Sequence, residues 1–361
     1  MRRLLFFLLV SMFLLVRVSL AATPITSCGT ISQSGEYYLV NDLFTSSGSC
    51  IVITNSSVKI DGMGHKIYGL GKEYDTTGIL LPDSTSTNDN EIYNLVIENV
   101  RHGIRMYGTF SQCFTNRFHD IQIKNVSFGI SISGLAADRN QFYNCYIEAT
   151  EKAINIVGYF ETFPSNENVF HDCTIISKNI AIHFDKADRN VFYRDNITGI
   201  IEFKDYEPSD TSIPNDNTFY DNIMNISLVN LTQLYDNKIY FNTTKQVETN
   251  IVGGPYIGGN YWIGYSENCT DSDGDYICDE PYVVSETLGF VDYLPLAKPP
   301  EVEKESPFRF VKSMFGIGIL ISFLAFGLSL ISSPEISVER LFEIIGMVIA
   351  ITILISIYGM L

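Results

Sequence analysis

Apolar side chains recur at every second residue in a set of related segments between Asn90 and Asn242. The copies begin at Asn90, Asn116, Asn140, Asn168, Asn190 and Asn217, for example NRFHDIQIKNVSFGI at Asn116 and NVFHDCTIISKNIAI at Asn168. A period of two is typical of strands, and a repeat of about two dozen residues matches one turn of a β-solenoid. In the copy at Asn116, the side chains predicted to point inward are Phe118, Ile121, Ile123, Ile130 and Ile132. The odd step between Phe118 and Ile121 marks a corner at Asp120 and at its equivalents Asn94, Asn144 and Asp172.

One such turn cannot bury its apolar face alone, so successive turns must stack. The pattern therefore predicts an all-β fold, a right-handed single-stranded parallel β-helix of the pectin-lyase-like kind. Its open ends require caps, because exposed strand edges promote aggregation. The segment from Cys28 to Cys50 is predicted to cap the N-terminal end and 242–296 the C-terminal end, so that the capped coil occupies 23–296.

The N-terminal segment of the chain predicts export, and the C-terminal segment predicts a membrane anchor. Residues 1–22 have the basic start, apolar stretch and small residues of a signal peptide, although Arg17 leaves an uncleaved signal anchor open. Two apolar runs, 314–331 and 341–361, are each close to the length that crosses a bilayer. They predict a transmembrane hairpin after a stalk at 297–313, with 332–340 as a short cytoplasmic loop and the coil outside the cell. The positions of Arg309, Lys312 and Arg340 disagree mildly with this orientation.

The formal net charge of −17 argues against a nucleic-acid partner, because phosphate binding requires a basic face. An acidic surface suits cations and neutral polymers better. The expected partners are therefore envelope polysaccharides or surface proteins, together with the membrane.

Seven cysteines are compatible with an oxidising compartment outside the cell. We predict a bridge between Cys28 and Cys50 at the start of the fold, and a second between Cys269 and Cys278 around an acidic loop. Cys145 and Cys173 occupy the same place in successive repeats, close enough to bridge, but two free buried thiols are favoured. Cys113 is left over.

Several segments resemble the NosD-like family of β-helix repeat proteins, also called carbohydrate-binding and sugar-hydrolysis repeats. They are CGTISQSGEYYLVNDL at Cys28, VKIDGMGHKIYG at Val58, the Asn-led repeats, and GGNYWIGYSENCTDSDGDYICDEPYVV with DYLPL after it. The resemblance covers about residues 25 to 296 and implies a right-handed parallel β-helix of an archaeal-type surface protein. It implies no single activity, because such coils include lyases, hydrolases, adhesins and copper-site maturation factors. A copper role lacks a clustered set of soft ligands, since Met63, Met106 and Met224 are scattered.

The acidic loop DSDGDYICD has the spacing of a calcium-binding loop. The carboxylates of Asp271, Asp273, Asp275 and Asp279, with the carbonyl of Ile277, match its first nine positions. The closing acid at the twelfth position is missing, because Tyr282 stands there. The loop thus predicts either a structural Ca²⁺ or a solvated acidic turn held by a disulfide.

The third residue after each leading asparagine forms a stripe predicted to face outward and to stack from turn to turn. Its members are Tyr93, His119, Tyr143, His171, Tyr193 and Tyr220. Exposed ring faces could bind sugars, whereas rings packed on each other would only stabilise the outer face. His119 and His171 lie on either side of Tyr143, too far apart for a direct metal pair.

An enzyme of this fold would need clustered outward carboxylates. The candidates are Asp120, Asp172, Asp185, Asp188 and Arg189, with Asp138 and Arg139 one coil earlier. Their repetition favours corner structure over a unique site, so we predict no catalytic residue. Seven sequons fit an exported surface, at Asn55, Asn125, Asn196, Asn225, Asn230, Asn242 and Asn268.

The sequence as a whole favours a membrane-anchored, non-enzymatic β-helix outside the cell that binds or organises envelope glycans or neighbouring surface proteins. One alternative is a polysaccharide lyase or glycoside hydrolase that uses the same face. Another is an accessory subunit whose membrane hairpin docks a larger complex through Glu335, Glu339 and Glu343, which have helical spacing.

Overall fold

The computed structural model describes residues 22–108, 111–134, 137–158, 166–203, 216–230 and 239–298. The predicted signal segment and the two C-terminal apolar runs lie outside these ranges. Within the ranges, no helix combines the length and apolarity needed to cross a bilayer.

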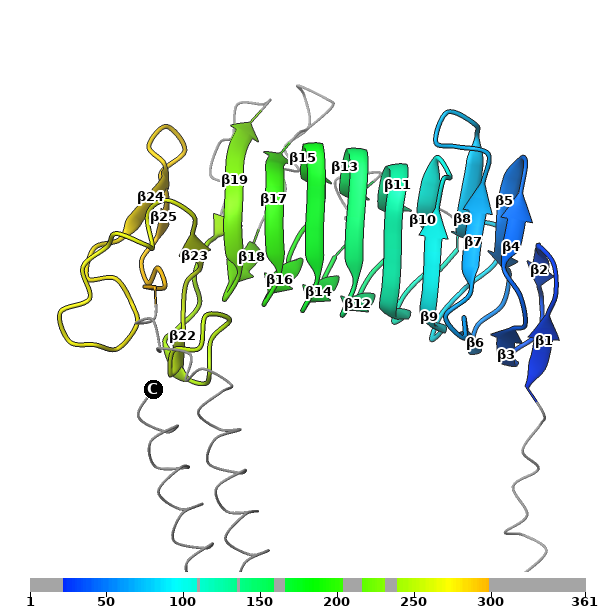
Figure 1. The fold of residues 1–361 in the computed structure, drawn as a ribbon, viewed down its shortest axis with the longest axis horizontal. Coiled ribbons are helices and arrows are strands. Elements are labelled where there is room, and N and C mark those ends of the chain that lie inside the picture. The colour runs from blue at the N-terminus through cyan, green and yellow to red at the C-terminus, as the bar shows by residue number, and fades with distance from the viewer. Residues whose placement is uncertain are drawn as a thin grey trace, which may run out of the picture. The chain divides into compact units, whose positions relative to one another are not determined.

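The described chain is a right-handed parallel β-helix with three strand faces, and its turns follow one another along one axis (Figure 1). On the first face the strands pair in register from turn to turn. They are β1 (Thr23–Ile25), β3 (Gly35–Leu39), β6 (Val58–Asp61), β9 (Glu91–Glu98), β11 (Arg117–Gly134), β12 (Gln141–Tyr143), β14 (Val169–His171), β16 (Val191–Tyr193), β18 (Asn217–Tyr220) and β20 (Ile239–Tyr240).

The second and third faces are built in the same way, and several long strands continue from one face to the next. The second face adds β4 (Leu43–Thr45), β7 (Lys66–Gly69), β13 (Tyr146–Val157), β15 (Thr174–Asp185), β17 (Asn196–Phe203), β19 (Ile223–Asn230) and β23 (Tyr261–Trp262). The third face adds β2 (Gly29–Ile31), β5 (Gly48–Ile53), β8 (Thr76–Leu81) and β10 (His102–Gly108). The predicted stacking of turns is therefore confirmed.

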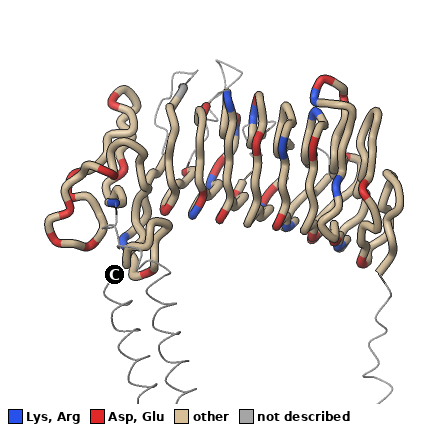
Figure 2. The backbone as a smooth tube through the Cα atoms, in the orientation of Figure 1, with Lys and Arg blue, Asp and Glu red and all other residues tan. Residues whose placement is uncertain are grey.

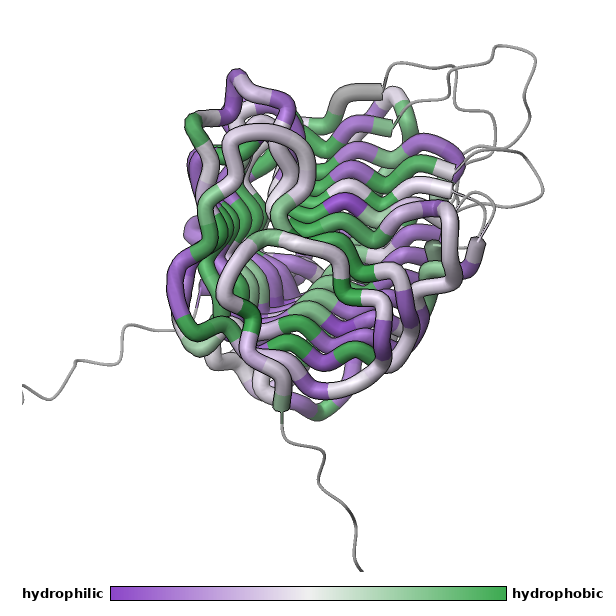
Figure 3. The backbone as a smooth tube through the Cα atoms, turned by 90° about the vertical axis from the view of Figure 1, so that its right-hand side faces the viewer, coloured by the Kyte–Doolittle hydropathy of each residue, from purple (hydrophilic) through white to green (hydrophobic). Residues whose placement is uncertain are grey.

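The core is the inside of this coil, where equivalent side chains from successive turns contact each other. Phe118, Phe142 and Phe170 are fully buried, and their rings stack with centroids 5.0 and 4.6 Å apart. The inward positions predicted in the Asn116 repeat are all buried. Apolar and polar positions alternate along the strands and line up in columns when the coil is seen along its axis (Figure 3), so the period of two in the sequence sets the inward and outward directions.

The leading asparagines form a buried hydrogen-bond ladder parallel to the axis. The backbone N–H and the side-chain amide of Asn140 both donate to Oδ1 of Asn168, at 3.0 Å each. The same pair of bonds joins Asn116 to Asn140, Asn168 to Asn190 and Asn190 to Asn217. Asparagine suits this position because its side chain offers a donor and an acceptor at once.

Two corners of the turns that carry the Asn-led repeats use residues in the left-handed backbone region. The corner between the first and second faces has φ between 52° and 58° at Asn94, Asp120, Asn144, Asp172, Arg194 and Asp221. The corner before each leading asparagine includes Arg139 and Arg189, with φ of 55° and 54°. Asparagine and aspartate tolerate this region better than most residues do. In the repeated Asp-Arg-Asn motif, the arginine takes this backbone conformation and the asparagine joins the ladder, so the motif has a structural role.

The two ends of the coil carry different caps. At the N-terminal end, a disulfide joins Cys28 to Cys50 in β5, with a Cα separation of 4.5 Å. At the other end, two antiparallel pairs flank the last parallel strand, β23. The pair β21 (Gln246–Val247) with β22 (Tyr256–Ile257) precedes it, and the pair β24 (Tyr282–Ser285) with β25 (Phe290–Asp292) follows it. Acidic and basic positions lie along the turns, and acidic ones also mark the loops at this end (Figure 2).

Candidate functional site

The predicted stripe forms one continuous stack of rings on the first face, which we call the aromatic stack. Neighbouring ring centroids lie 4.6 to 5.3 Å apart, and the planes of neighbouring rings deviate by no more than 11°. Its members are Tyr93, His119, Tyr143, His171, Tyr193 and Tyr220. The faces of the four inner rings are covered by their neighbours, so a sugar could reach only the ring edges there. Burial raises the pKa of the tyrosines, that of Tyr220 to about 12, which keeps the phenols neutral.

Carboxylates bind the two histidines of the stack along its edge. Nδ1 of His119 lies 2.6 Å from Asp120, and its Nε2 lies 3.5 Å from Glu91. Nδ1 of His171 lies 2.8 Å from Asp172. A hydrogen bond from Lys59 holds the pKa of Glu91 below its ordinary value. Each imidazole is thus held by at least one acid, and the two are separated by the ring of Tyr143, as the sequence predicted.

A groove of about 330 Å³ runs beside the stack, where the first face turns into the second. We call it the corner groove, and its lining is Asp120, Gln122, Asn144, Cys145, Tyr146, Asp172 and Thr174. Asp120 and Asp172 border both the groove and the stack. The side chains offer carboxylates, amides and hydroxyls, the donors and acceptors that complement sugar hydroxyl groups.

The candidate catalytic acids do not all gather at this groove. Asp120 and Asp172 share it, with the turn of Asn144 between them, so their backbones lie about 10 Å apart at two strand spacings. Asp120 accepts a hydrogen bond from Asn144, and Asp172 forms an ion pair with Arg194 at 3.3 Å. The other candidates, Asp138, Arg139, Asp185, Asp188 and Arg189, belong to the third face or to the corner before the leading asparagines.

In the acidic loop, oxygens of Asp271, Asp273 and Asp275 lie within 4.8 Å of one another. Asp279, the fourth predicted ligand, instead accepts hydrogen bonds from the backbone N–H of Ser272. The disulfide between Cys269 and Cys278 closes the loop with a Cα separation of 5.6 Å. Lys245 forms an ion pair with Asp275, so a cation is already in contact with one of the three acids.

The remaining cysteines are free and buried in the described chain, as predicted for Cys145 and Cys173. Burial raises the pKa of the Cys173 thiol and brings that of Cys113 to about 12, which disfavours thiolates. The acidic loop is the one group of three or more potential metal ligands found in the described residues. It offers oxygen ligands, with no imidazole or sulfur among them.

Four of the predicted sequon asparagines are exposed, namely Asn125, Asn196, Asn225 and Asn268. Asn55 and Asn242 are half-buried, and Asn55 donates to the carbonyl of Ser32 at 3.0 Å. The side chain of Asn230 lies outside the described residues.

The sequence did not reveal a second column of buried polar groups on the second face, one position after the corner. Backbone N–H groups donate along this column from Cys173 to Asp195, from Asp195 to Asn222 and from Asn222 to Asn260, at 2.7 to 3.2 Å. Asp195 is fully buried, and burial raises its pKa far above the ordinary value. The sequence did contain a signal for this column, because later repeats have polar residues at positions that are apolar in earlier repeats. For example, Asp195 stands at the position equivalent to Ile121.

Comparison with known proteins gives one family and a set of distant structures. The family described as periplasmic copper-binding protein (NosD) matches residues 52–267. The tailspike protein of Dettilon is 12% identical, with a TM-score of 0.29 over 57% of this chain and 55% of its own. Tailspike protein 2 of bacteriophage CBA120, in its enzymatically active domain, is 13% identical, with a TM-score of 0.24 over 56% and 38%. The chain thus spans about half of the first tailspike and less of the second. No match was found among curated proteins.

Proposed function

The chain belongs to the NosD family of periplasmic copper-binding proteins, and from this premise we propose that it is an exported β-helix protein that binds envelope glycans or neighbouring surface proteins without catalysis. The corner groove carries the glycan part of the proposal. It is an open groove on a rigid coil, lined by carboxylates, amides and hydroxyls in successive turns. A repetitive polymer fits such a lining because each turn can repeat the contacts of the one before it.

Retention of polysaccharides by the full-length protein in mild detergent would test this proposal. Gln122→Ala together with Thr174→Ala should abolish retention on columns of envelope polysaccharide, because both side chains line the groove. Gln141→Ala is the matched control, because Gln141 is exposed on the first face outside the groove. The binding proposal fails if the unaltered protein retains no polymer and no surface protein.

A hydrolase remains the second candidate, because Asp120 and Asp172 both line the groove, with their backbones two strand spacings apart, about 10 Å. Inverting hydrolases use a pair of carboxylates about 6.5 to 9.5 Å apart. Both acids occupy left-handed corner positions, and Asn94 and Asn144 fill the same positions in other turns. The corner conformation therefore explains why these acids are present, and for this reason we favour binding without catalysis. Release of reducing sugars from any polysaccharide in a panel, lost in Asp172→Asn, would support the hydrolase instead.

Copper fits the described residues poorly. Copper sites in proteins use imidazole, thiolate or thioether ligands, whereas the acidic loop supplies carboxylates. His119 and His171 are held by carboxylates and separated by the ring of Tyr143. The family description is therefore not carried over to this chain as a copper function.

The acidic loop is proposed as a structural Ca²⁺ site. Three carboxylates within 4.8 Å of one another support it, since calcium prefers oxygen ligands. Calcium chloride should raise the melting temperature relative to EDTA, and Asp273→Asn should remove that increase, whereas the exposed control Glu286→Gln should keep it. Equal melting temperatures with and without calcium would contradict the calcium site. The loop would then be a solvated acidic turn held by the disulfide.

Anchoring through the two C-terminal apolar runs is part of the proposal, supported by their length and by their low charge, since Glu343 is the one charged residue in them. The protein should stay with membranes through alkaline carbonate washing and leave them only in detergent. Co-purification of a defined partner complex in mild detergent, lost when Glu339 and Glu343 are replaced by glutamine, would favour the accessory-subunit alternative.

A further inference from the structure

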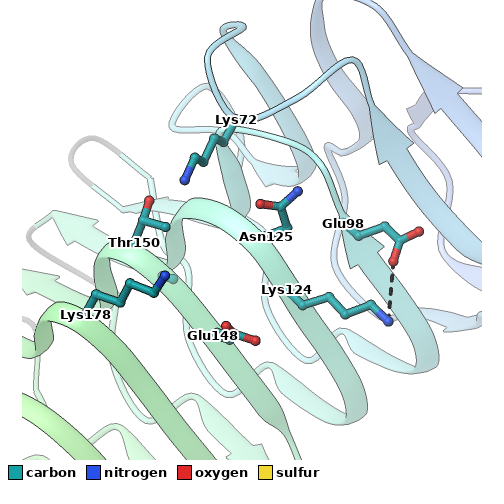
Figure 4. Close-up of a pocket in the computed structure, with 8 residues that line it drawn as sticks. Lys72, Glu98, Lys124, Asn125, Glu148, Thr150 and Lys178 are labelled. Atoms are coloured by element: carbon teal, nitrogen blue, oxygen red, sulfur yellow. Dashed lines mark ion pairs between the residues drawn. The ribbon is translucent and has the colours of Figure 1, made fainter.

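A second groove, which we call the lysine groove, lies at the end of the second face and has a volume of about 280 Å³ (Figure 4). Its lining is Lys72, Glu98, Lys124, Asn125, Glu148, Ala149, Thr150 and Lys178. It shares no residue with the corner groove. Three lysines thus line one groove of a chain whose net charge is −17.

The charges in the lysine groove alternate along the axis of the coil. Lys72 follows β7, Lys124 belongs to β11, and Lys178 belongs to β15. Glu98 in β9 and Glu148 in β13 come from the turns between them. Lysines therefore come from every second turn, and two strand spacings place them about 10 Å apart.

The lysines exceed the carboxylates that could neutralise them. Glu98 forms ion pairs with both Lys66 and Lys124, with distances from its carboxylate oxygens to Nζ of 3.1 and 3.4 Å. Glu148 accepts a hydrogen bond from the hydroxyl of Tyr146 at 3.0 Å. In the part of the chain that the structure describes, neither Lys72 nor Lys178 forms an ion pair. A surplus of positive charge thus remains at both ends of the groove.

We propose that the lysine groove binds a linear polysaccharide that carries a carboxylate on every second sugar. Two turns of the coil are comparable in length to one disaccharide of an extended polysaccharide, so carboxylates could meet the lysines while the sugars between them pass Glu98 and Glu148. The amide of Asn125 and the hydroxyl of Thr150 supply hydrogen bonds for sugar hydroxyls. A nucleic-acid strand carries a charge about every 3.4 Å and would place phosphates beside both glutamates.

This inference deepens the proposed function, and it rests on the proposal that the coil binds glycans. It concerns a separate groove and an anionic class of ligand. The two proposals can therefore fail independently, because variants of the corner groove and variants of the lysine groove do not overlap.

The experiment measures binding of defined oligosaccharides to the full-length protein in mild detergent by calorimetry. Hyaluronan oligosaccharides have a carboxylate on alternate sugars, oligogalacturonates on every sugar, and chitin oligosaccharides on none. The protein is produced in a host without N-glycosylation, because a glycan on the sequon Asn125 would obstruct the groove. Hyaluronan should bind most tightly of the three, and its affinity should fall as salt is added.

Variants then assign the binding to this groove. Lys72→Gln with Lys178→Gln should weaken hyaluronan binding on the order of tenfold, because each removes one cation. Glu148→Gln should tighten binding severalfold, since it removes a repelling carboxylate, and a gain of affinity cannot come from misfolding. Arg189→Gln is the matched control, because it removes an exposed cation at another corner and should leave affinity unchanged.

Three results would overturn the inference. The first is that the double lysine variant binds hyaluronan as tightly as the unaltered protein does. Another is tighter binding of oligogalacturonate than of hyaluronan, which would contradict the match in spacing. The third is retention of neutral glycans in the corner groove without any affinity for hyaluronan, which would leave the proposed function intact.

Discussion

At the scale of single residues, the leading asparagines are the most demanding positions of the coil. Oδ1 of Asn168 accepts two hydrogen bonds from Asn140, and its side-chain amide donates to Asn190 and to the carbonyl of Ala137. All of these groups are buried. Replacing one asparagine therefore leaves donors of the neighbouring turn without partners, and such groups are costly to bury.

Asn168→Ala should lower the free energy of unfolding by about 2 to 4 kcal/mol, because it removes several buried hydrogen bonds at once. Urea denaturation followed by circular dichroism measures the change. Asn179→Ala serves as control, because Asn179 is exposed and lies outside the ladder. Equal denaturation midpoints for the two variants would show that the ladder contributes nothing specific.

A second residue-scale effect concerns buried carboxyls. Burial raises the pKa of Asp221 from 3.8 to about 6, and Asp292 shifts in the same direction to about 6. The folded protein therefore keeps protons that the unfolded chain has already released above about pH 4. Because the folded state binds more protons in this window, these two carboxyls make stability fall as pH rises from about 4 to about 6, and their contribution then levels off.

Asp221→Asn should reduce this loss of stability by about 2 kcal/mol, because an amide does not titrate. Asparagine also suits the backbone there, since Asn94 and Asn144 occupy the same corner with similar φ. Melting temperatures between pH 4 and 7 measure the slope. A slope as steep in the variant as in the original protein would rule out Asp221 as a contributor. Asp292 and Asp195, whose pKa values burial also raises, contribute to the part that persists.

At the scale of elements, small residues on the third face let neighbouring turns approach closely. A Cβ at Gly129 would lie 2.4 Å from the carbonyl oxygen of Ala153 and 2.6 Å from the side chain of Ile147. Gly78 and Gly103 have equivalent contacts with the turns that follow them. The strand spacing is fixed by backbone hydrogen bonds, so an added side chain must displace the chain locally.

Gly129→Ala should therefore destabilise the coil by about 1 to 3 kcal/mol through overpacking. Thermal unfolding by calorimetry measures the effect. The reference variant is Gly264→Ala, because its Cβ would meet open space in the C-terminal cap, although its positive φ carries a small cost of its own. If the Gly129→Ala variant is as stable as the original protein, the turns can move apart at this position without a loss of stability.

At the scale of the whole molecule, the coil depends on its ends. Each inner turn is covered by a neighbour on both sides, whereas the first turn has only one neighbour. The disulfide between Cys28 and Cys50 fixes that first turn to β5 across a separation of 22 residues. In β-helices, disruption of an end exposes the edges of all three faces.

Replacing Cys28 and Cys50 together by serine should lower the free energy of unfolding by about 3 kcal/mol, the order expected for a loop of this length. Denaturation with and without a reducing agent measures it, and the reduced original protein should approach the variant. If reduction lowers the stability of the variant equally, the loss belongs to the bridge between Cys269 and Cys278 instead.

The sequence by itself determined the all-β coil, its repeat and its inward ladder, because alternation in a repeat of this length permits few arrangements that bury Phe118 and its equivalents. It also determined both disulfide pairs and the placement of Tyr93 through Tyr220 in one outward row. Only the tertiary structure decided that the inner rings of that row cover one another, that Asp279 accepts hydrogen bonds from Ser272 and does not join the other three acids, and that Lys72, Lys124 and Lys178 line one groove. The physical reason is that these contacts join different turns, and their geometry depends on the exact register, the corner conformations and the loops, which a pattern along one turn does not specify.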